Sequence, residues 1–429
     1  MQVLRTNPTA RTKSLHITSA LPPSASMPIA FAATAGVVSL LAWADAKRKS
    51  EKPVIQLPSS PAAAAFHQGV LDRCQSIHEE YKCVPGLTNG HVETIFAAKL
   101  RRSPKVEYAR ECLIMADKGC VALDWDHEAQ GLPEDAPIVI LMPGLTGGSG
   151  DSYILHAVVH ARELGIRAVV CNGRGTAQSP VTTPQYYSAS YTGDIREVVA
   201  HIQRTYPRST LLACGWSLGA NILIKYLAEE GQASPLSAAV SMCNPFDLSI
   251  SDANFQVGFN RIYDWNLAAA LRRIMGDHGA LWNRAKGKFK PKVAQAARTI
   301  REFDDAITIH SFGWESTDQY YAASSSSKAV PQVAIPMLCL QALDDPIAPK
   351  EAIPYEALRE NPNCVLATTP CGGHLGWVSG KGGPLEAPWS NEVMMQWLVS
   401  VMQSQKEGQG MMGGIAGAEA KLEEVGAKR

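Results

Sequence analysis

Short apolar runs alternate with stretches of helical period through most of this chain. Continuous apolar runs begin near residues 138, 167, 211, 238, 336 and 364. Between them, segments such as 152–163 and 194–205 repeat apolar residues at the spacing of an amphipathic helix. Strands and helices in this alternation form a parallel sheet that helices cover on both faces. The pattern therefore predicts an α/β fold with a doubly wound, mostly parallel sheet.

Two segments depart from this alternation. Residues 106–115 and 120–125 flank a turn at Asp117-Lys118-Gly119, which predicts a β-hairpin before the parallel strands. Later, about ninety residues separate the strands expected near 238 and 336, far more than one crossover requires. This insertion, about 249–330, is rich in aromatic and aliphatic side chains. We expect it to form a helical cap, some of whose side chains line an acyl-binding pocket.

The pentapeptide Gly215-Trp216-Ser217-Leu218-Gly219 joins an apolar run, 211–214, to a helical run, 222–227. A nucleophile elbow needs this context, because its serine occupies a strained turn between strand and helix that flanking glycines make possible. An idle serine in a glycine-rich turn is the alternative. Partners for the serine elsewhere in the chain decide between the two interpretations.

An activated serine needs a base and a carboxylate that orients the base. In one known arrangement of such triads, the three residues occur along the sequence in the order serine, acid, histidine. The apolar run 335–343 predicts a buried strand that ends at Asp344 and Asp345. His374 follows the next predicted strand, in a glycine-rich loop. The candidates are Ser217 as nucleophile, one of the two aspartates as acid, and His374 as base.

A glycine-rich loop, 143–150, follows the strand expected near 138. An oxyanion hole needs two backbone N–H groups aimed at the developing negative charge, and glycines let the backbone approach a substrate closely. We predict that the N–H groups of Leu145 and of Leu218, the residue after the nucleophile, are these donors. A phosphate-binding loop is the rival interpretation, but no Gly-Lys-Ser/Thr follows and the glycine spacing is not G-x-G-x-x-G.

With these parts in place, the chain resembles the AB hydrolase 4 family of the α/β-hydrolase superfamily, a group of esterases and lipases that includes medium-chain fatty-acid ethyl ester synthases. The likeness extends from about Gly86 to Val401. Further motifs that carry it are Asn89-Gly90-His91-Val92-Glu93-Thr94-Ile95, Leu123-Asp124-Trp125, Asn172-x-Arg174-Gly175, Arg301-Glu302-Phe303-Asp304-Asp305 and Asp318-Gln319-Tyr320-Tyr321-Ala322. The resemblance implies an α/β-hydrolase fold with an inserted helical cap.

The resemblance also implies roles for single residues. Ser217 matches the nucleophile, Asp345 before Pro346 matches the acid, and His374 matches the base, which leaves Asp344 to cap or brace its loop. One departure is that the usual His-Gly opening of the oxyanion loop reads Pro143-Gly144 here.

The implied activity is that of a serine hydrolase. Its acyl-enzyme on Ser217 would come from acylglycerol, phospholipid, or short- to medium-chain acyl esters. One alternative is an alcohol O-acyltransferase that uses the same acyl-enzyme, and another is a catalytically silent binding protein of hydrolase fold.

Composition narrows the remaining function classes. Forty basic residues balance forty acidic ones, so we expect no nucleic-acid partner. The 10 cysteines are scattered without a C-x-x-C pair, and we interpret them as reduced core residues typical of a reducing compartment. His156 and His160 have the four-residue spacing of a zinc face but lack a third ligand nearby in the sequence. We expect neither a metal nor a cofactor.

The two ends of the chain differ from this core. Residues 1–26 contain no acidic residue and predict a disordered or targeting leader. Met27–Ala44 is an uncharged stretch of 18 residues, from which we predict a single-pass membrane anchor, with the endoplasmic reticulum as one candidate membrane. A transit peptide for a chloroplast or mitochondrion is the alternative. We expect a linker and a helical segment over 45–104, the hydrolase domain over 105–403 and a disordered tail over 404–429.

Overall fold

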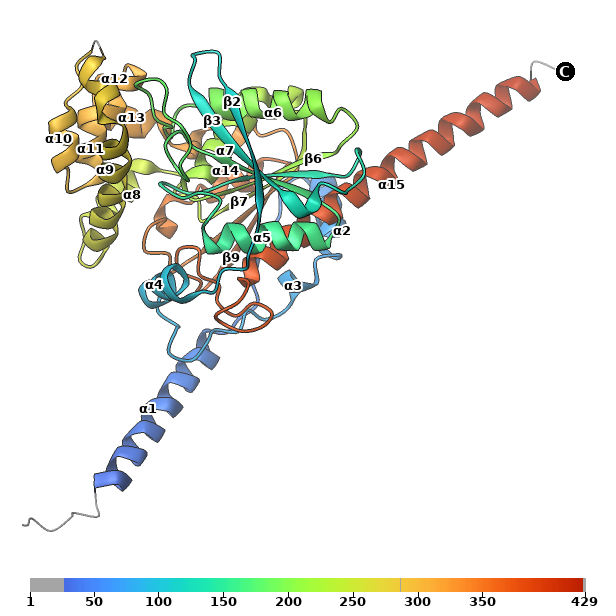
Figure 1. The fold of residues 1–429 in the computed structure, drawn as a ribbon. Helices are drawn as coiled ribbons and strands as arrows, with labels where there is room; N and C mark the ends of the chain where they lie inside the picture. The colour runs from blue at the N-terminus through green and yellow to red at the C-terminus, as the bar shows by residue number, and fades with distance from the viewer. Residues whose placement is uncertain (1–26, 286, 427–429) are drawn as a thin grey trace, which may run out of the picture. The chain divides into compact units, whose positions relative to one another are not determined.

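The computed structural model describes residues 27–285 and 287–426, and side chains from 38 to 408 within them (Figure 1). Contacts between residues divide the chain into two units, Met1–Ala42 and Trp43–Arg429. Helix α1 (Met27–Lys49) begins in the first unit and ends in the second. The elements that form the fold belong to the second unit.

Within the described residues, nine strands form one sheet in the order β1-β9-β8-β7-β6-β4-β5-β3-β2. Their bounds are β1 Val54–Gln56, β2 Tyr108–Ile114, β3 Cys120–Asp126, β4 Ile138–Met142, β5 Arg167–Asn172, β6 Leu211–Trp216, β7 Leu236–Met242, β8 Met337–Ala342 and β9 Cys364–Thr369. Strands β4 to β9 pair in parallel, while β1, β2 and β3 pair antiparallel at the two edges. The predicted doubly wound, mostly parallel sheet is confirmed.

Both faces of the sheet are buried beneath helices, as parallel strands require. Val139 and Leu141 of β4 belong to one hydrophobic core, whereas Ile138 and Ile140 belong to the other. The first core includes side chains of α2 (Pro61–Leu71), α5 (Ser152–Glu163) and α15 (Trp389–Gly426). The second includes side chains of α6 (Gly193–Thr205), α7 (Leu218–Glu230) and α14 (Tyr355–Glu360). Two short helices precede the hairpin, α3 (Gln75–His78) and α4 (Gly90–Leu100).

The expected helical cap lies between β7 and β8 (Figure 1). Its α-helices are α8 (Leu248–Phe255), α9 (Asn260–Arg284), α10 (Pro291–Ala296), α11 (Ile300–Phe303), α12 (Ile309–Phe312) and α13 (Thr317–Ser324). A π-helical turn, Asp304–Thr308, joins α11 to α12. Leu271, Met275, Trp282 and Phe303 pack into a third hydrophobic core together with Val181 and Tyr186, which lie between β5 and α6. This core is separate from the two cores of the sheet.

The predicted single-pass membrane anchor finds no support in the structure. Met27–Ala44 lies in α1, and no helix in the part of the chain that the structure describes is long and apolar enough to cross a membrane. The leader expected over 1–26 lies outside the described residues, so the transit peptide stays a prediction.

The two flanking segments contain structure beyond the expected linker, helical segment and tail. Within 45–104, β1 pairs with β9 at the edge of the sheet, and Ala46 is buried in the first of the two cores. Helix α15 continues to Gly426, where we expected a disordered tail from residue 404. The run from Ala416 to Val425 is rich in Ala, Glu, Lys and Leu, which favour a helix.

Candidate active site

Ser217 occupies the turn between β6 and α7, the place expected of a nucleophile elbow. Its backbone has φ 52° and ψ −118°, a strained conformation for a residue with a side chain. The flanking glycines are required by close approach: a Cβ on Gly215 would lie 2.5 Å from the Gly219 carbonyl oxygen, and a Cβ on Gly219 would lie 2.2 Å from the Met142 carbonyl oxygen. The sequence motif thus forms the strained turn that it predicts.

Asp345 and His374 form a buried acid–base pair at the ends of β8 and β9. The His374 Nδ1 atom lies 2.8 Å from Asp345 Oδ2. Oδ1 of the same carboxylate accepts hydrogen bonds from the Ile347 and Ala348 N–H groups, each at 2.8 Å. An Nδ1–H that donates to Asp345 leaves Nε2 of His374 as the proton acceptor. No hydrogen bond between Ser217 and His374 occurs among the described contacts, and such bonds often tighten only with substrate bound.

The expected oxyanion donors border the same cavity as Ser217. Leu145 and Leu218 line one pocket together with the serine. Within the described residues, neither the Leu145 N–H nor the Leu218 N–H donates to another protein group. Gly144 allows the two loops to approach, because a Cβ there would lie 3.2 Å from the Ser217 Cβ. Both N–H groups are therefore available to a ligand in this pocket.

Hydrogen bonds connect the loop that carries His374 to α4, the helix that contains the Asn89–Ile95 motif. The Thr94 hydroxyl accepts a hydrogen bond from the His374 N–H at 2.8 Å and donates to the Gly90 carbonyl oxygen at 2.6 Å. Glu93 accepts from the Val378 N–H at 3.1 Å, and Arg101 donates to the Leu375 and Gly376 carbonyl oxygens. Side chains of α4, and of Arg101 directly after it, thus bond four backbone groups of this loop.

Two carboxyl groups, half-buried Asp344 and buried Glu93, support this arrangement. Asp344 accepts from the Gly373 N–H at 2.9 Å, so it braces the loop while Asp345 faces the histidine. Burial raises the pKa of Asp344 to about 6, and the Asp345 charge adds to the shift while the Gly373 N–H opposes it. Burial likewise raises the pKa of Glu93 to about 7, against the hydrogen bonds from Tyr81 and Val378. Both groups sit in surroundings that disfavour their charged form.

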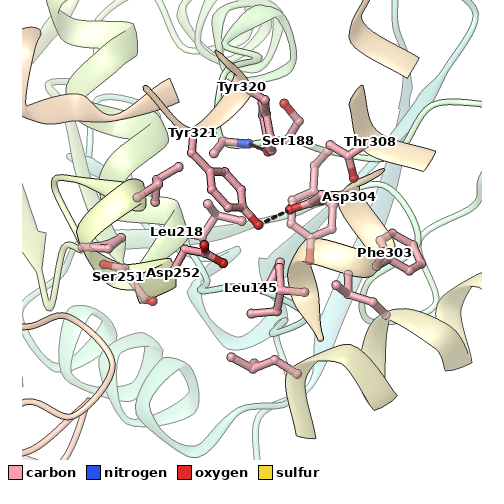
Figure 2. Close-up of a pocket in the computed structure, with 18 of the residues that line it drawn as sticks. Leu145, Ser188, Leu218, Ser251, Asp252, Phe303, Asp304, Thr308, Tyr320 and Tyr321 are labelled. Atoms are coloured by element: carbon pink, nitrogen blue, oxygen red, sulfur yellow. Dashed lines mark hydrogen bonds between the residues drawn. The ribbon is translucent and has the colours of Figure 1, made fainter. Parts of the chain in front are cut away.

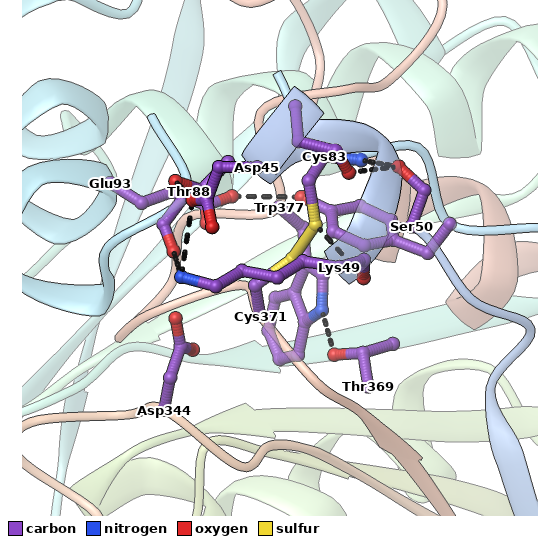
Figure 3. Close-up of a disulfide and its surroundings, with 12 residues drawn as sticks. Asp45, Lys49, Ser50, Cys83, Thr88, Glu93, Asp344, Thr369, Cys371 and Trp377 are labelled. Carbon is purple, nitrogen blue, oxygen red and sulfur yellow. Dashed lines mark hydrogen bonds and ion pairs between the residues drawn. A yellow bond between two sulfur atoms is a disulfide. The ribbon is translucent and has the colours of Figure 1, made fainter. Parts of the chain in front are cut away.

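A disulfide corrects the prediction that all the cysteines are reduced. Cys83 and Cys371 are bonded across 288 residues of sequence (Figure 3). Cys371 begins the loop that carries His374, and Cys83 precedes α4. The bond joins the two segments that meet beneath the histidine, and it removes the basis for inferring a reducing compartment. Spacing alone could not reveal a pair so distant in sequence.

An apolar pocket extends from Ser217 into the cap (Figure 2). Its volume is about 120 Å³. Apolar lining comes from both the core and the cap, in particular from Leu145, Leu218, Leu248, Phe255, Leu267, Leu271, Ile274, Ile300, Phe303 and Ile347. The cap residues therefore line a cavity over the nucleophile, as the insertion predicted.

Side chains that can ligate a metal ion lie close together at the acid–base pair. Among the described residues, Cys243, Asp345 and His374 bring ligand atoms within 4.8 Å of one another. Burial raises the pKa of the Cys243 thiol far above its usual range, which favours a neutral thiol, and its sulfur accepts from the Leu375 N–H at 3.3 Å. His156, of the suspected zinc face, lies with Nε2 2.9 Å from the Arg102 carbonyl oxygen. Each of these side chains has a protein partner instead.

The sequence analysis predicted five site residues: Ser217, Asp345, His374, Leu145 and Leu218. In the structure all five follow the carboxyl ends of parallel strands, β4, β6, β8 and β9. The bracing by Thr94 and Glu93 and the buried Asp304 of the pocket were not predicted. All three lie in motifs that carried the family resemblance. The positions were visible, but their contacts come from distant segments.

Comparison with known proteins gives consistent matches. A family model described as alpha/beta hydrolase fold matches residues 137–378. The embryogenesis-associated protein EMB8 of Picea glauca is 46% identical over 356 residues, covering 81% of this chain and 78% of the relative. The human phospholipase ABHD3 is 32% identical over 344 residues, covering 79% and 83%. A monoacylglycerol lipase of Saccharomyces cerevisiae is 35% identical over 254 residues, covering 58% and 56%.

Proposed function

This chain belongs to the α/β-hydrolase family, and from that premise we propose that it hydrolyses carboxylic esters through an acyl-enzyme on Ser217. Asp345 and His374 complete the triad. The observation that carries the proposal is that the strained Ser217 elbow, two unused backbone N–H groups and an apolar cavity share one site, with the buried Asp345–His374 pair formed in the same domain.

The proposed reaction has two halves. His374 Nε2 takes the proton of the Ser217 hydroxyl while Oγ attacks the carbonyl carbon of the ester, and Asp345 stabilises the imidazolium that forms. The Leu145 and Leu218 N–H groups donate to the oxyanion. When the bond from the carbonyl carbon to the alcohol oxygen breaks, His374 returns its proton to the leaving alcohol. Water, deprotonated by His374, then attacks the acyl-enzyme, releases the acid and restores Ser217.

Acylglycerol, phospholipid or shorter acyl esters are the proposed substrates. The apolar lining of the pocket supports an acyl chain, and two relatives are named a phospholipase and a monoacylglycerol lipase. Alcohol in place of water would turn the second half into acyl transfer, so the two outcomes share every residue.

A direct test compares the wild type with Ser217→Ala on p-nitrophenyl butyrate, p-nitrophenyl octanoate and glycerol monooctanoate. We expect hydrolysis by the wild type and its loss in the variant, with an unchanged thermal midpoint, because the serine supplies chemistry and little packing. Added ethanol measures the share of acyl-enzyme that alcohol captures. Turnover retained by Ser217→Ala would overturn the assignment.

A further inference from the structure

Polar side chains gather inside the otherwise apolar pocket over Ser217 (Figure 2). Asp304 lies at the start of the π-helical turn, and its Oδ2 accepts a hydrogen bond from the Tyr321 hydroxyl at 2.9 Å. Ser251 of α8 lines the same pocket and is only 4% exposed. Its hydroxyl is buried and has no hydrogen-bond partner among the described residues. Both Asp304 and Ser251 retain hydrogen-bonding capacity.

Burying such groups is costly unless something binds them. A buried hydroxyl without a partner costs about 1–3 kcal/mol, and a carboxyl group costs more. The carboxylate of Asp345 accepts three hydrogen bonds. The carboxyl group of Asp304 faces two protein hydroxyls, those of Tyr321 and Thr308. A carboxylate can accept about four hydrogen bonds, so Asp304 keeps acceptor capacity in a cavity that Ser217 shares.

The local backbone supports a role in ligand binding. The turn Asp304–Thr308 is π-helical, a rare form that costs hydrogen-bond geometry and occurs mostly at functional sites. Both ends of this turn, Asp304 and Thr308, line the pocket. A regular α-helix through these residues would change where the two side chains point. The irregular turn therefore serves the pocket and not the packing of the cap alone.

Electrostatics narrow the ligand to a neutral group. Asp252 also lines the pocket, but Arg301 pairs with it at 2.8 Å. Burial raises the pKa of Asp304 to about 7, against the Thr308 and Tyr321 hydroxyls, so this carboxyl group carries no full charge at neutral pH. A hydroxyl group can donate to Asp304 and accept from Ser251.

We propose that Asp304, Tyr321 and Ser251 form a site that binds a free hydroxyl group of the substrate, so that hydroxyl-bearing esters are preferred. The hydroxyl could belong to the alcohol part, as in a partial glyceride, or to the acyl chain. The inference rests on the proposed ester hydrolysis at Ser217. Asp304 and Ser251 bind the hydroxyl, and Tyr321 positions Asp304.

Three esters of matched chain length test this site: propyl octanoate, glycerol monooctanoate and propyl ω-hydroxyoctanoate. We expect the wild type to prefer one hydroxylated ester over propyl octanoate in kcat/KM. Asp304→Asn and Ser251→Ala should lower that preference about tenfold or more. The ester that loses its advantage tells whether the hydroxyl lies on the alcohol or on the acyl side.

Tyr321→Phe and Ser188→Ala separate binding from packing. Tyr321→Phe frees Oδ2 of Asp304 and should lower the preference less than Asp304→Asn. The Ser188 hydroxyl lines the pocket but already pairs with Ser190 at 2.8 Å, so Ser188→Ala should leave the preference unchanged. Should Asp304→Asn fail to fold, Ser251→Ala carries the test, because its hydroxyl bonds no described protein group.

The possible failures are distinguishable. Hydrolysis of all three esters without preference, or an equal loss on all three in the variants, overturns the hydroxyl site and leaves ester hydrolysis standing. Hydrolysis of none of them, with no labelling of Ser217 by a fluorophosphonate, overturns both proposals.

Discussion

The two regions that border Ser217 are held in different ways. On the sheet side, polar side chains hold the loop that carries His374. Thr94 of α4 and Asp344 accept hydrogen bonds from its backbone, and Asp345 accepts one from the His374 ring. On the cap side, apolar packing around Leu271 and Phe303 shapes the pocket. Hydrogen bonds fix direction, whereas apolar contacts mainly fix volume. The difference suggests that the loop sets the rate of the chemistry and that the cap sets which ester enters.

The sharpest challenge to this division compares the two neighbouring aspartates. Asp345→Asn should lower kcat by up to about 10⁴, because the amide cannot hold His374 in the required tautomer. Asp344→Asn should lower kcat far less, since it braces only the Gly373 N–H. Steady-state kinetics on p-nitrophenyl butyrate measures both. The reverse ranking would show that the other carboxylate is the acid.

Stability against pH tests the buried carboxyl group beneath the loop. The pKa of Glu93 is raised from 4.5 to about 7, so the folded state holds a proton that the unfolded state has lost between these values. The free energy of unfolding should therefore fall as pH rises from about 4.5 to about 7, by on the order of 3 kcal/mol from this group.

Glu93→Gln should flatten that part of the curve, because glutamine does not titrate. Denaturant unfolding of both proteins across this pH range gives the difference. Parallel curves for the two proteins would contradict the account of Glu93.

Thr94 gives a finer test of the hydrogen-bonded side, as a positioning residue for His374. Thr94→Val removes the acceptor for the His374 N–H and should lower kcat about tenfold to hundredfold, with KM little changed, because a small displacement of a catalytic group is costly. Thr94→Ser keeps the hydroxyl and should restore most of kcat. Equal kcat in the valine and serine variants would mean that the hydroxyl is not what holds the loop.

The smallest expected effect lies on the cap side. Leu271→Trp should fill part of the pocket and lower kcat/KM for p-nitrophenyl octanoate about tenfold, while p-nitrophenyl butyrate changes little. The ratio of the two rates is the measurement, and Leu271→Met serves as the volume-conserving control. A fall in both rates together would place Leu271 in support of the chemistry, against the division drawn above.

The sequence predicted the parts of this molecule that depend on local pattern. The strands from 138 to 369 and the elbow at Ser217 follow from apolar runs, glycines and strand ends, which report on neighbours in sequence. The acid was open between Asp344 and Asp345 until the family resemblance favoured one.

The features that the sequence analysis did not predict depend on contacts between distant segments of the chain. The Cys83–Cys371 bond, the hydroxyl of Thr94 beneath His374 and the edge strand β1 each join segments more than 200 residues apart.

The most direct test of the central claim is covalent labelling of the full chain by a fluorophosphonate probe, with peptide mapping by mass spectrometry. Such a probe reacts with a serine that a base activates and ignores an idle one. We expect one adduct on the peptide that contains Ser217, no adduct in Ser217→Ala, and much slower labelling in His374→Gln. Labelling at another serine, or none in the folded wild type, would contradict the assignment of Ser217 as the nucleophile.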